Sequence, residues 1–389
     1  MRKVPKSQDE TIRRPLHQPL PGSSIALFSV ERVKVPSGFP NLGNTCFLNS
    51  ALMALYSLSA FRQFAQSIPL SAGPVSALLR QFCQQNPAIY NSGEVVRGLL
   101  ASIPGFKDGR QHCSYSFILH LLASLDTELR SEGKVSRSPD LTGSLPLEKY
   151  KAGKCAKLHD IFSILTENLF ICSKCKANIS FSNFSYGRTM DLPVPKRFQS
   201  FRDMVTFGKG NFYLTNSHNR YRSMDNLETY LAYFSSKDTQ NGPFALDSKP
   251  TLYTCFDYCL RATLMTAGNE LLCSQCGNTR HYKQPFLRHL SSVLVLHFQR
   301  YDELNAGKLE TVVPFEDTLD LSPYISSNSP IYDLKAVIYH NGMLYFGHYT
   351  ATIRLNGTWY SFNDDQVSEV LRPEAENAYL LLYEARICR

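Results

Sequence analysis

The sequence predicts an α+β fold in which helices come first and antiparallel strands follow. Apolar residues recur at helical spacing between about residues 38 and 130, whereas after about residue 160 they fall into short β-rich runs. These two patterns are typical of amphipathic helices and of strands, respectively. Helices and strands that are segregated along a chain indicate an α+β fold and not a doubly wound parallel sheet.

Two stretches of the first region have apolar residues at the i, i+3, i+4, i+7 spacing of an amphipathic helix. They are Leu48, Ala51, Leu52, Leu55 and Leu58, and then Phe117, Leu121, Leu122 and Leu125. We therefore predict a helix in each stretch, and the first of them begins near Cys46.

The second region contains runs that are rich in β-branched and aromatic residues. They lie at 179–187, 291–301, 332–340, 345–355, 357–363 and 378–385. The connections between them carry the dipeptides Asn341-Gly342 and Asn356-Gly357. Because Asn and Gly tolerate the positive φ angles of tight hairpin turns, we predict a hairpin at each dipeptide.

The chain of 389 residues could form two or three domains at about 150 residues each, or one large domain with inserted lobes. We predict a flexible tail over 1–36 and one folded domain over 37–386. The tail contains Pro5, Pro15, Pro19, Pro21 and Pro36 among scattered charges. Residues 196–250 are polar, rich in Ser, Asn and Tyr, and weakly periodic, so we predict an insertion there.

The composition excludes several classes of protein. The 41 Lys and Arg against 33 Asp and Glu give a net charge of +8 without a long basic run, which argues against a nucleic-acid binder. No apolar stretch approaches the ~18 residues of a membrane helix, and the N-terminus lacks the apolar core of a secretory signal. We therefore expect an intracellular protein of the cytoplasm or nucleus, without membrane contact.

Cys46 is the first candidate catalytic residue. It lies at the predicted start of a helix, two residues after the helix-breaking pair Gly43 and Asn44. A helix N-terminus favours the reactive thiolate through its dipole and free N–H groups. Asn41 could donate a side-chain N–H to an oxyanion, together with the Cys46 backbone N–H. The alternative is a small buried cysteine that only fills the core.

His348 is the candidate general base, and it lies in a strand-like run after Gly347. A thiol protease needs an imidazole for its thiolate and a third group that orients this imidazole. Asn363 or Asp364, at the end of a neighbouring run, has the right chemistry for the third role. The alternative is a structural histidine beside a solvated acidic turn.

Two Cys-x-x-Cys pairs are the candidate metal ligands. The sequence has eleven cysteines, and without a signal peptide such pairs favour a reducing compartment and thiols that hold a metal. Four thiolates in tetrahedral geometry suit structural zinc. The four residues are Cys172, Cys175, Cys273 and Cys276. The segment between the pairs is longer than a usual zinc-ribbon loop, but closure entropy grows slowly with loop length.

Three long segments together resemble the ubiquitin-specific proteases, which are papain-like cysteine peptidases. The Cys-box segment matches at Gly38, Asn41, Gly43, Thr45, Cys46, Asn49 and Ser50. The His-box segment matches at Tyr332, Leu334, Ala336, Val337, His340, Gly342, Gly347, His348, Tyr349, Ala351, Trp359, Phe362, Asp364 and Val367. Between them, matches occur at Leu294, His297, Phe298, Arg300, Lys308 and the DLSPY run. The resemblance extends from about residue 37 to 386.

This resemblance implies a right-hand architecture. A helical thumb over about 37–160 would carry Cys46, β fingers over about 161–290 would grip ubiquitin, and a β palm mainly over 291–386 would carry His348. The two Cys-x-x-Cys pairs fall where the fingers of the family often hold a zinc ribbon, so we expect one structural zinc and no catalytic cofactor. His340 matches a family position and is expected to be structural.

The resemblance also implies the site residues and the reaction. By residue matching, Cys46 is the nucleophile, His348 the base and Asn41 the oxyanion donor. Asn363 matches the third triad position and Asp364 the adjacent acid, so we place Asn363 first. The expected activity is that of a monomeric deubiquitinase, a thiol isopeptidase that hydrolyses the bond after the C-terminal glycine of ubiquitin in protein conjugates.

One segment departs from the family pattern. Where the family has Gln-Gln-Asp-Ala-x-Glu-Phe, this chain has Gln111 to Phe117 with Cys113 at the Asp position and Ser116 at the Glu position. In the family these two acids face the arginines of the ubiquitin tail, and carboxylate–guanidinium pairs are strong contacts. Three explanations of the missing acids remain. Another acid compensates for them, the chain is a peptidase for another ubiquitin-like modifier, or it is a catalytically weak ubiquitin-binding scaffold.

Overall fold

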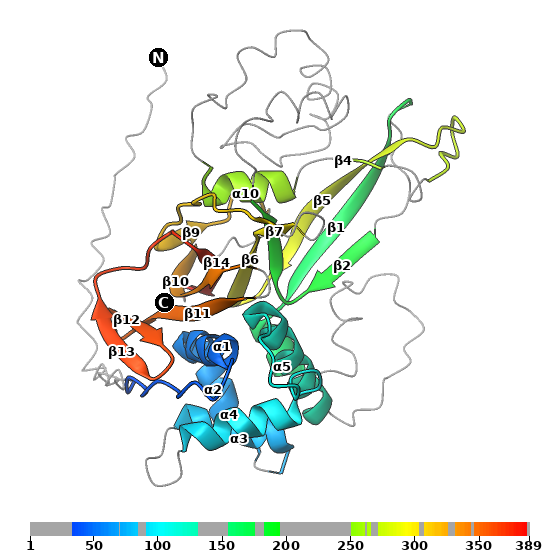
Figure 1. Cartoon of the computed structure of the whole chain (residues 1–389). Coiled ribbons are helices and arrows are strands. Elements are labelled where there is room, and N and C mark those ends of the chain that lie inside the picture. The colour runs from blue at the N-terminus through cyan, green and yellow to red at the C-terminus, as the bar shows by residue number, and fades with distance from the viewer. Residues whose placement is uncertain are drawn as a thin grey trace, which may run out of the picture. The chain divides into compact units, whose positions relative to one another are not determined.

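A computed structural model shows the arrangement of the helices and strands (Figure 1). It describes residues 33–69, 71–84, 91–130, 155–175, 183–194, 250–260, 263–265, 271–302, 307–325, 331–343 and 346–386. The predicted insertion at 196–250 lies outside these residues except for its last position, and the predicted tail lies outside them up to residue 32. The chain divides into two units, Met1–Lys34 and Val35–Arg389, and the elements that the structure describes belong to the second.

The first part of the second unit is helical, as predicted. Its helices are α1 (Cys46–Ser57), α2 (Ser59–Ser67), α3 (Pro74–Gln84), α4 (Ser92–Ser102), α5 (Ser114–Glu128) and α7 (Ala156–Ile161). We refer to these helices as the helical lobe. None of the helices in the described part of the chain is long and apolar enough to span a membrane.

Helix α1 is the centre of the helical lobe. All of its twelve residues are buried, because it packs on one side against α2 and α5 and on the other against strands β10, β11 and β12. A helix that is buried all round needs apolar or small residues on every face, and the sequence CFLNSALMALYS supplies them. The predicted helical position Leu58 is buried but caps α1, and α2 begins directly after it.

The main sheet has eight strands, in the order β13-β12-β11-β10-β14-β6-β3 with β9 paired to β10. Their bounds are β3 (Met190–Pro193), β6 (Val293–Gln299), β9 (Thr318–Asp320), β10 (Ile331–Gly342), β11 (Gly347–Leu355), β12 (Thr358–Asn363), β13 (Gln366–Val370) and β14 (Ala378–Ala385). All of the pairs are antiparallel except β3 with β6.

A second sheet has four strands in the order β2-β1-β5-β4. The strands are β1 (Ile164–Cys172), β2 (Asn183–Gly187), β4 (Thr263–Leu264) and β5 (His281–Leu290). It extends away from the helical lobe in Figure 1. Two short strands, β7 (Tyr301–Asp302) and β8 (Gly307–Lys308), pair with each other. The predicted α+β class is confirmed.

The main sheet is packed on both faces. Helix α1 covers strands β10, β11 and β12, and a second core cluster includes residues of β3, β6, β10 and β14 together with helix α10 (Leu252–Cys259). Leu252, Cys255 and Phe256 bring α10 into that core, and each has no exposed surface. A sheet that is covered on both faces gives its central strands the continuous apolar runs seen in β6 and β14.

Both predicted hairpins are present, but only one of them has its turn at the predicted dipeptide. Asn356 and Gly357 have φ angles of 51° and 91° and connect β11 to β12, so that Leu355 pairs with Thr358. Asn341 and Gly342 instead extend β10, and Gly342 pairs with Gly347. The turn of that hairpin begins one residue later, where Met343 N–H donates to the Phe346 carbonyl over 2.7 Å.

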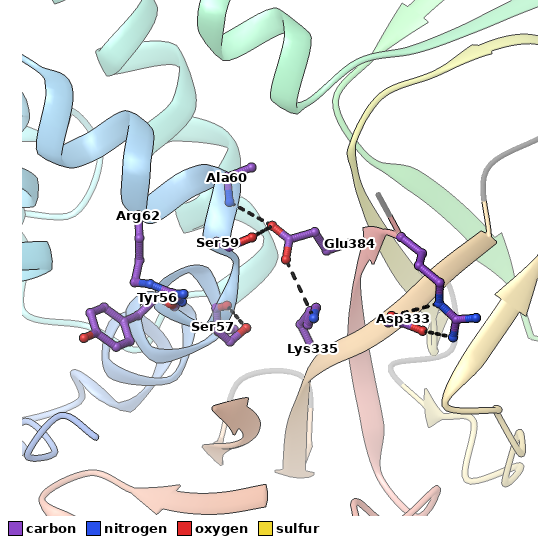
Figure 2. A network of polar contacts seen from close by, with 10 residues as sticks. Tyr56, Ser57, Ser59, Ala60, Arg62, Asp333, Lys335 and Glu384 are labelled. Atoms are coloured by element: carbon purple, nitrogen blue, oxygen red, sulfur yellow. Dashed lines mark hydrogen bonds and ion pairs between the residues drawn. The ribbon is translucent and has the colours of Figure 1, made fainter. Parts of the chain in front are cut away.

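A buried carboxylate joins the main sheet to the helical lobe (Figure 2). Glu384 of β14 accepts hydrogen bonds from Ala60 N–H and Ser59 Oγ, both over 2.8 Å. These donors lie in the first turn of α2, whose own cap residue Leu58 makes no side-chain hydrogen bond. The first N–H groups of a helix lack partners inside the helix, so Glu384 supplies the missing cap from another element.

We predict that Glu384→Ala lowers the free energy of unfolding by about 1–3 kcal/mol, because it removes the acceptor of the partly buried Ala60 N–H and Ser59 hydroxyl. Glu384→Gln keeps an acceptor oxygen and should cost less. Urea unfolding measures both. Lys335→Ala is the matched control, since its Nζ lies 3.9 Å from Glu384 and its side chain is 29% exposed. An equal loss in the control would mean that the ion pair, and not the cap, carries the effect.

Candidate active site

Cys46 is the first residue of α1, and a tight turn precedes it. Gly43 and Asn44 have φ angles of 90° and 58°, a region that glycine and asparagine adopt at little cost. The Asn41 Oδ1 accepts hydrogen bonds from Gly43 N–H at 3.1 Å and from Thr45 N–H at 3.2 Å. The side-chain oxygen of Asn41 therefore faces the turn, and its side-chain nitrogen Nδ2 is left for other contacts.

His348 and Asn363 meet at the ends of two neighbouring strands. The Nε2 of His348 lies 2.6 Å from the Oδ1 of Asn363. An amide oxygen can only accept, so Nε2 carries the proton and the neutral ring keeps Nδ1 as its basic atom. Asn363 is the last residue of β12, which pairs with β11 only from Ala351 onward. The Asn363 side chain therefore reaches His348 beyond the end of the strand pairing.

Asp364 makes contact with the helical lobe. Its Oδ2 accepts from Asn41 Nδ2 at 2.9 Å, and its Oδ1 accepts from Asn49 Nδ2 at 2.8 Å. It has a φ angle of 54° and begins the turn between β12 and β13. Its carbonyl oxygen accepts from Phe39 N–H over 3.1 Å. A Cβ atom on Gly38 would lie 2.0 Å from that oxygen, so glycine is required there.

The thiol of Cys46 is almost fully buried, with 2% of the residue exposed. Burial raises its pKa, the backbone N–H of Tyr349 lowers it by hydrogen bonding to the sulfur, and the charge of Asp364 raises it. Tyr349 directly follows His348, and α1 packs against β11. The predicted nucleophile and base therefore lie on facing elements, and the thiol form of Cys46 is favoured in the free protein.

The structure brings the predicted residues together in two groups. Asn363 lies against His348, and Asp364 lies against Asn41. Sequence reasoning gave no role to Asn49, whose amide holds the second oxygen of Asp364. Asn49 is buried and lies three residues after Cys46, on the same side of α1. The sequence signal that could have identified Asn49 was a polar residue at this spacing in a largely apolar helix. Such a residue is buried, and a buried amide needs a hydrogen-bond partner.

His340 has the structural environment that the sequence analysis expected. It is 3% exposed, its Nδ1 contacts the Tyr301 hydroxyl, and its ring lies 4.3 Å from the Tyr349 ring. Burial lowers the pKa of His340 to about 4, with smaller contributions from Lys308 and His348. The ring is therefore neutral at pH 7, and it packs against Tyr349 of the strand that carries His348.

Cys113 and Ser116 make neutral contacts at the start of α5. Cys113 Sγ lies 2.9 Å from the Tyr379 hydroxyl, and Ser116 Oγ lies 3.4 Å from His120 Nδ1. Asp191 of β3 is a carboxylate that contacts α5 here. It hydrogen bonds to Tyr115 and lies 2.7 Å from His297 Nδ1.

The four predicted metal ligands lie together at the far end of the second sheet. The sulfur atoms of Cys172, Cys175, Cys273 and Cys276 are all within 4.8 Å of one another. Two of the sulfur pairs are 3.6 Å apart. A tetrahedral zinc site with Zn–S bonds of about 2.3 Å places its sulfurs about 3.8 Å apart, so the group could hold a metal of this size.

The electrostatics of the cysteine group also suit a cation. Burial raises the pKa of Cys172, but the backbone N–H groups of Cys175 and Lys174 and the amide of Asn278 outweigh it and lower the pKa to about 5. The Asn278 Nδ2 donates to Cys172 Sγ over 3.4 Å. Metal-binding thiols must be deprotonated, and these N–H donors stabilise the thiolate.

Comparison with known proteins supports a single family. The family model of ubiquitin carboxyl-terminal hydrolases matches residues 37–383. Ubiquitin carboxyl-terminal hydrolase 2 of Rattus norvegicus is 25% identical over 382 residues, which cover 90% of this chain and 54% of the rat protein. Ubiquitin carboxyl-terminal hydrolase 21 of Bos taurus is 24% identical over 396 residues, which cover 89% and 61%. The chain spans less than two thirds of the length of these relatives.

Solved structures agree on the fold. The SAGA DUB module of Ubp8, Sgf11, Sus1 and Sgf73 bound to monoubiquitin matches with a TM-score of 0.64 and 20% identity, over 93% of this chain and 71% of the matched chain. The same module bound to ubiquitin aldehyde gives 0.63 and 21%, over 93% and 72%. The family model extends across both sheets and the helical lobe. The chain therefore belongs to the ubiquitin carboxyl-terminal hydrolase family.

Proposed function

We propose that the chain is a cysteine-type deubiquitinase that hydrolyses the bond after the C-terminal glycine of ubiquitin in protein conjugates. The observation that carries this proposal is the 2.6 Å contact of His348 Nε2 with Asn363 Oδ1, on the strand that faces Cys46. Membership of the ubiquitin carboxyl-terminal hydrolase family supports the substrate class. So does the likeness to the Ubp8 module, whose solved structures contain monoubiquitin and ubiquitin aldehyde.

The reaction begins with transfer of the Cys46 proton to His348, whose free ring nitrogen is Nδ1. The thiolate attacks the carbonyl carbon of the C-terminal glycine, and the negative charge develops on its oxygen. His348 then gives its proton to the departing lysine amine, so that the C–N bond breaks and a thioester forms. Water attacks the thioester with His348 as base and releases the free carboxylate.

Asn363 and Asp364 have different tasks in this proposal. Asn363 orients the imidazole of His348 by accepting its Nε2 proton. Asp364 holds the Asn41 amide through one N–H, so that the second N–H and the Cys46 backbone N–H can face the oxyanion. The right-hand division into a thumb at about 37–160, fingers at about 161–290 and a palm mainly at 291–386 is part of the same proposal.

The first prediction from this proposal concerns the proposed catalytic residues. Cys46→Ala should abolish turnover of a fluorogenic ubiquitin C-terminal amide, and His348→Ala should be nearly as severe. Asn363→Ala should cost less than either, because an orienting group contributes less than the nucleophile. Circular dichroism of each variant checks that the fold is intact. Full activity of Cys46→Ala would end the peptidase proposal.

The second prediction concerns the charge of Asp364. Because this charge raises the pKa of Cys46, Asp364→Asn should lower that pKa and speed alkylation of Cys46 by iodoacetamide at pH 7. Turnover of the ubiquitin substrate should nevertheless fall, since Asn41 loses a charged partner. Asp365→Asn, at the adjacent exposed position, is the control. Slower alkylation in Asp364→Asn would show that its carboxylate favours the thiolate instead.

A peptidase for another ubiquitin-like modifier is the second candidate function. It is favoured by the absence of acids at Cys113 and Ser116, which instead contact Tyr379 and His120. Hydrogen bonds to charged groups contribute about 1.5–3 kcal/mol each, so the loss of two would weaken binding of an arginine-containing tail. A catalytically weak ubiquitin-binding scaffold is consistent with the same observation.

We expect Cys113→Asp combined with Ser116→Glu to lower the KM for the ubiquitin substrate, because carboxylates would then face the arginines of the tail. Steady-state kinetics measure the change, and Ser92→Glu, at the start of α4, controls for added charge. A panel of activity probes for ubiquitin and related modifiers separates the candidates. An adduct of Cys46 with a different modifier alone would favour the second function, and no adduct with any would favour the scaffold.

One structural zinc at the four cysteines completes the proposal. The ligands are Cys172 at the end of β1 and Cys175 in the following turn, together with Cys273 and Cys276 before β5. A metal there would link the two turns at the end of the β1–β5 pair. Its contribution would be to the stability of the second sheet and not to the reaction.

We predict about one zinc per chain in protein purified without chelator, because four thiolates form a closed tetrahedral site. Elemental analysis measures the content. Cys172→Ser should release the metal and lower the melting temperature, whereas Cys155→Ser, in the helical lobe, should leave the metal content unchanged. A zinc content near zero with freely reactive thiols would mean that packing alone holds this end of the sheet.

A further inference from the structure

The strand that carries His348 lacks a neighbour on one side at its first residues. On the β10 side, Gly347, His348 and Tyr349 pair with Gly342, Asn341 and His340. On the other side, β12 pairs with β11 only from Ala351. Backbone groups of a strand that face an absent neighbour need other partners.

Gln111 supplies partners at Gly347. Its Nε2 donates to the Gly347 carbonyl oxygen over 2.7 Å, and its Oε1 accepts from Gly347 N–H over 3.1 Å. A glutamine amide has the same donor and acceptor as a peptide group. Gln111, which precedes α5 in the helical lobe, therefore contacts the strand in the way that the backbone of a neighbouring strand would.

The helical lobe supplies a second partner two residues further along. Tyr349 N–H hydrogen bonds to the sulfur of Cys46. Alternate residues of a strand direct their backbone groups to the same side, so Gly347 and Tyr349 both face the helical lobe. His348 lies between these two contacts, and one of them involves the proposed nucleophile.

Gly347 is also confined from behind. A Cβ atom at this position would lie 2.2 Å from His340 Nε2 and 2.7 Å from the Asn341 carbonyl oxygen. His340 is buried and is held by the Tyr301 hydroxyl. The peptide group before His348 thus lies between Gln111 and the buried ring of His340, and loss of the Gln111 contact would free it on one side only.

We propose that Gln111 is a positioning residue for His348. Its amide fixes the main chain at Gly347 relative to the helical lobe and so sets the approach of the His348 imidazole to Cys46. The proposal rests on the proposed function for its kinetic consequences. It also predicts a change in the reactivity of Cys46 that can be measured without substrate, because proton exchange between Cys46 and His348 depends on the same geometry.

Steady-state kinetics of Gln111→Ala with a fluorogenic ubiquitin C-terminal amide test the inference. Misplacement of a reacting group by about 1 Å can cost up to about a hundredfold in rate, so we expect kcat to fall between about tenfold and a hundredfold while KM changes less than about threefold. Gln84→Ala, an exposed glutamine of α3, is the matched control and should match the wild type. A rise in KM with unchanged kcat would overturn the inference, because Gln111 would then bind substrate directly.

Gln111→Glu separates the two hydrogen bonds by pH. The ionised carboxylate keeps the acceptor for Gly347 N–H but faces the Gly347 carbonyl oxygen without a donor. The protonated carboxyl regains the donor, and the neighbouring oxygen raises its pKa above the usual value of about 4.3. The ratio of the Gln111→Glu kcat to the wild-type kcat should therefore rise as the pH falls from about 7.5 to about 5.5. A ratio that falls with the pH would overturn the positioning role, because the ionised side chain would then hold Gly347 better than the protonated one.

Alkylation of Cys46 by iodoacetamide gives the readout without ubiquitin. If Gln111 sets the approach of His348, Gln111→Ala should slow alkylation at pH 7 and shift its pH profile toward higher pH, because the imidazole stabilises the thiolate less. An unchanged profile would overturn the inference. If ubiquitin is not turned over by the wild type but the profile shifts, the proposed function fails and the positioning role stands.

Discussion

The proposed active site depends on a fixed distance between helix α1 and strand β11. Cys46 begins the helix and His348 lies near the start of the strand, and about three hundred residues separate them in the sequence. Proton transfer between a thiol and an imidazole needs the sulfur and the ring nitrogen within hydrogen-bonding distance. The complete burial of α1 between the other helices and the main sheet provides this precision. A helix that packs on all sides cannot slide or rotate without opening cavities, which are costly.

Side chains of one lobe complete the hydrogen bonding of the other along this contact. Glu384 of the main sheet caps α2, Asp364 binds Asn41 and Asn49, and Gln111 binds the backbone of Gly347. Each contact joins polar groups of the two lobes across the boundary. The apolar core determines that the lobes pack, whereas these directional contacts determine their register, since hydrogen bonds weaken steeply with poor geometry.

Much of the fold follows from local patterns, and the site follows only in part. Helical spacing predicted α1 and α5, and β-rich runs predicted five strands of the main sheet, because burial of one face leaves a period in the sequence. These strands are β6, β10, β11, β12 and β14, whereas the short strands β3, β9 and β13 were not predicted. The hairpin predicted at Asn341-Gly342 is present, but its turn lies after the dipeptide, since the pairing of Gly342 with Gly347 extends the strand to Gly342. Turn propensity is local, but strand length is set by partners distant in sequence. The contacts of Gln111 could not be predicted for the same reason, because a glutamine shows no period and its partner is 236 positions away.

The separate contacts of Asn363 and Asp364 follow from the end of a strand. Successive residues of a strand direct their side chains to opposite sides, and Asn363 is the last residue of β12. Asp364 adopts a φ angle of 54° and begins the turn into β13. Adjacent residues therefore reach different partners, His348 on the neighbouring strand and Asn41 in the helical lobe. Residue types alone allow either side chain to orient the imidazole, and only the backbone conformation at this turn distinguishes them. The same turn, through the Asp364 carbonyl oxygen and Phe39 N–H, holds the segment that leads to Cys46, so one short connection orders both halves of the site.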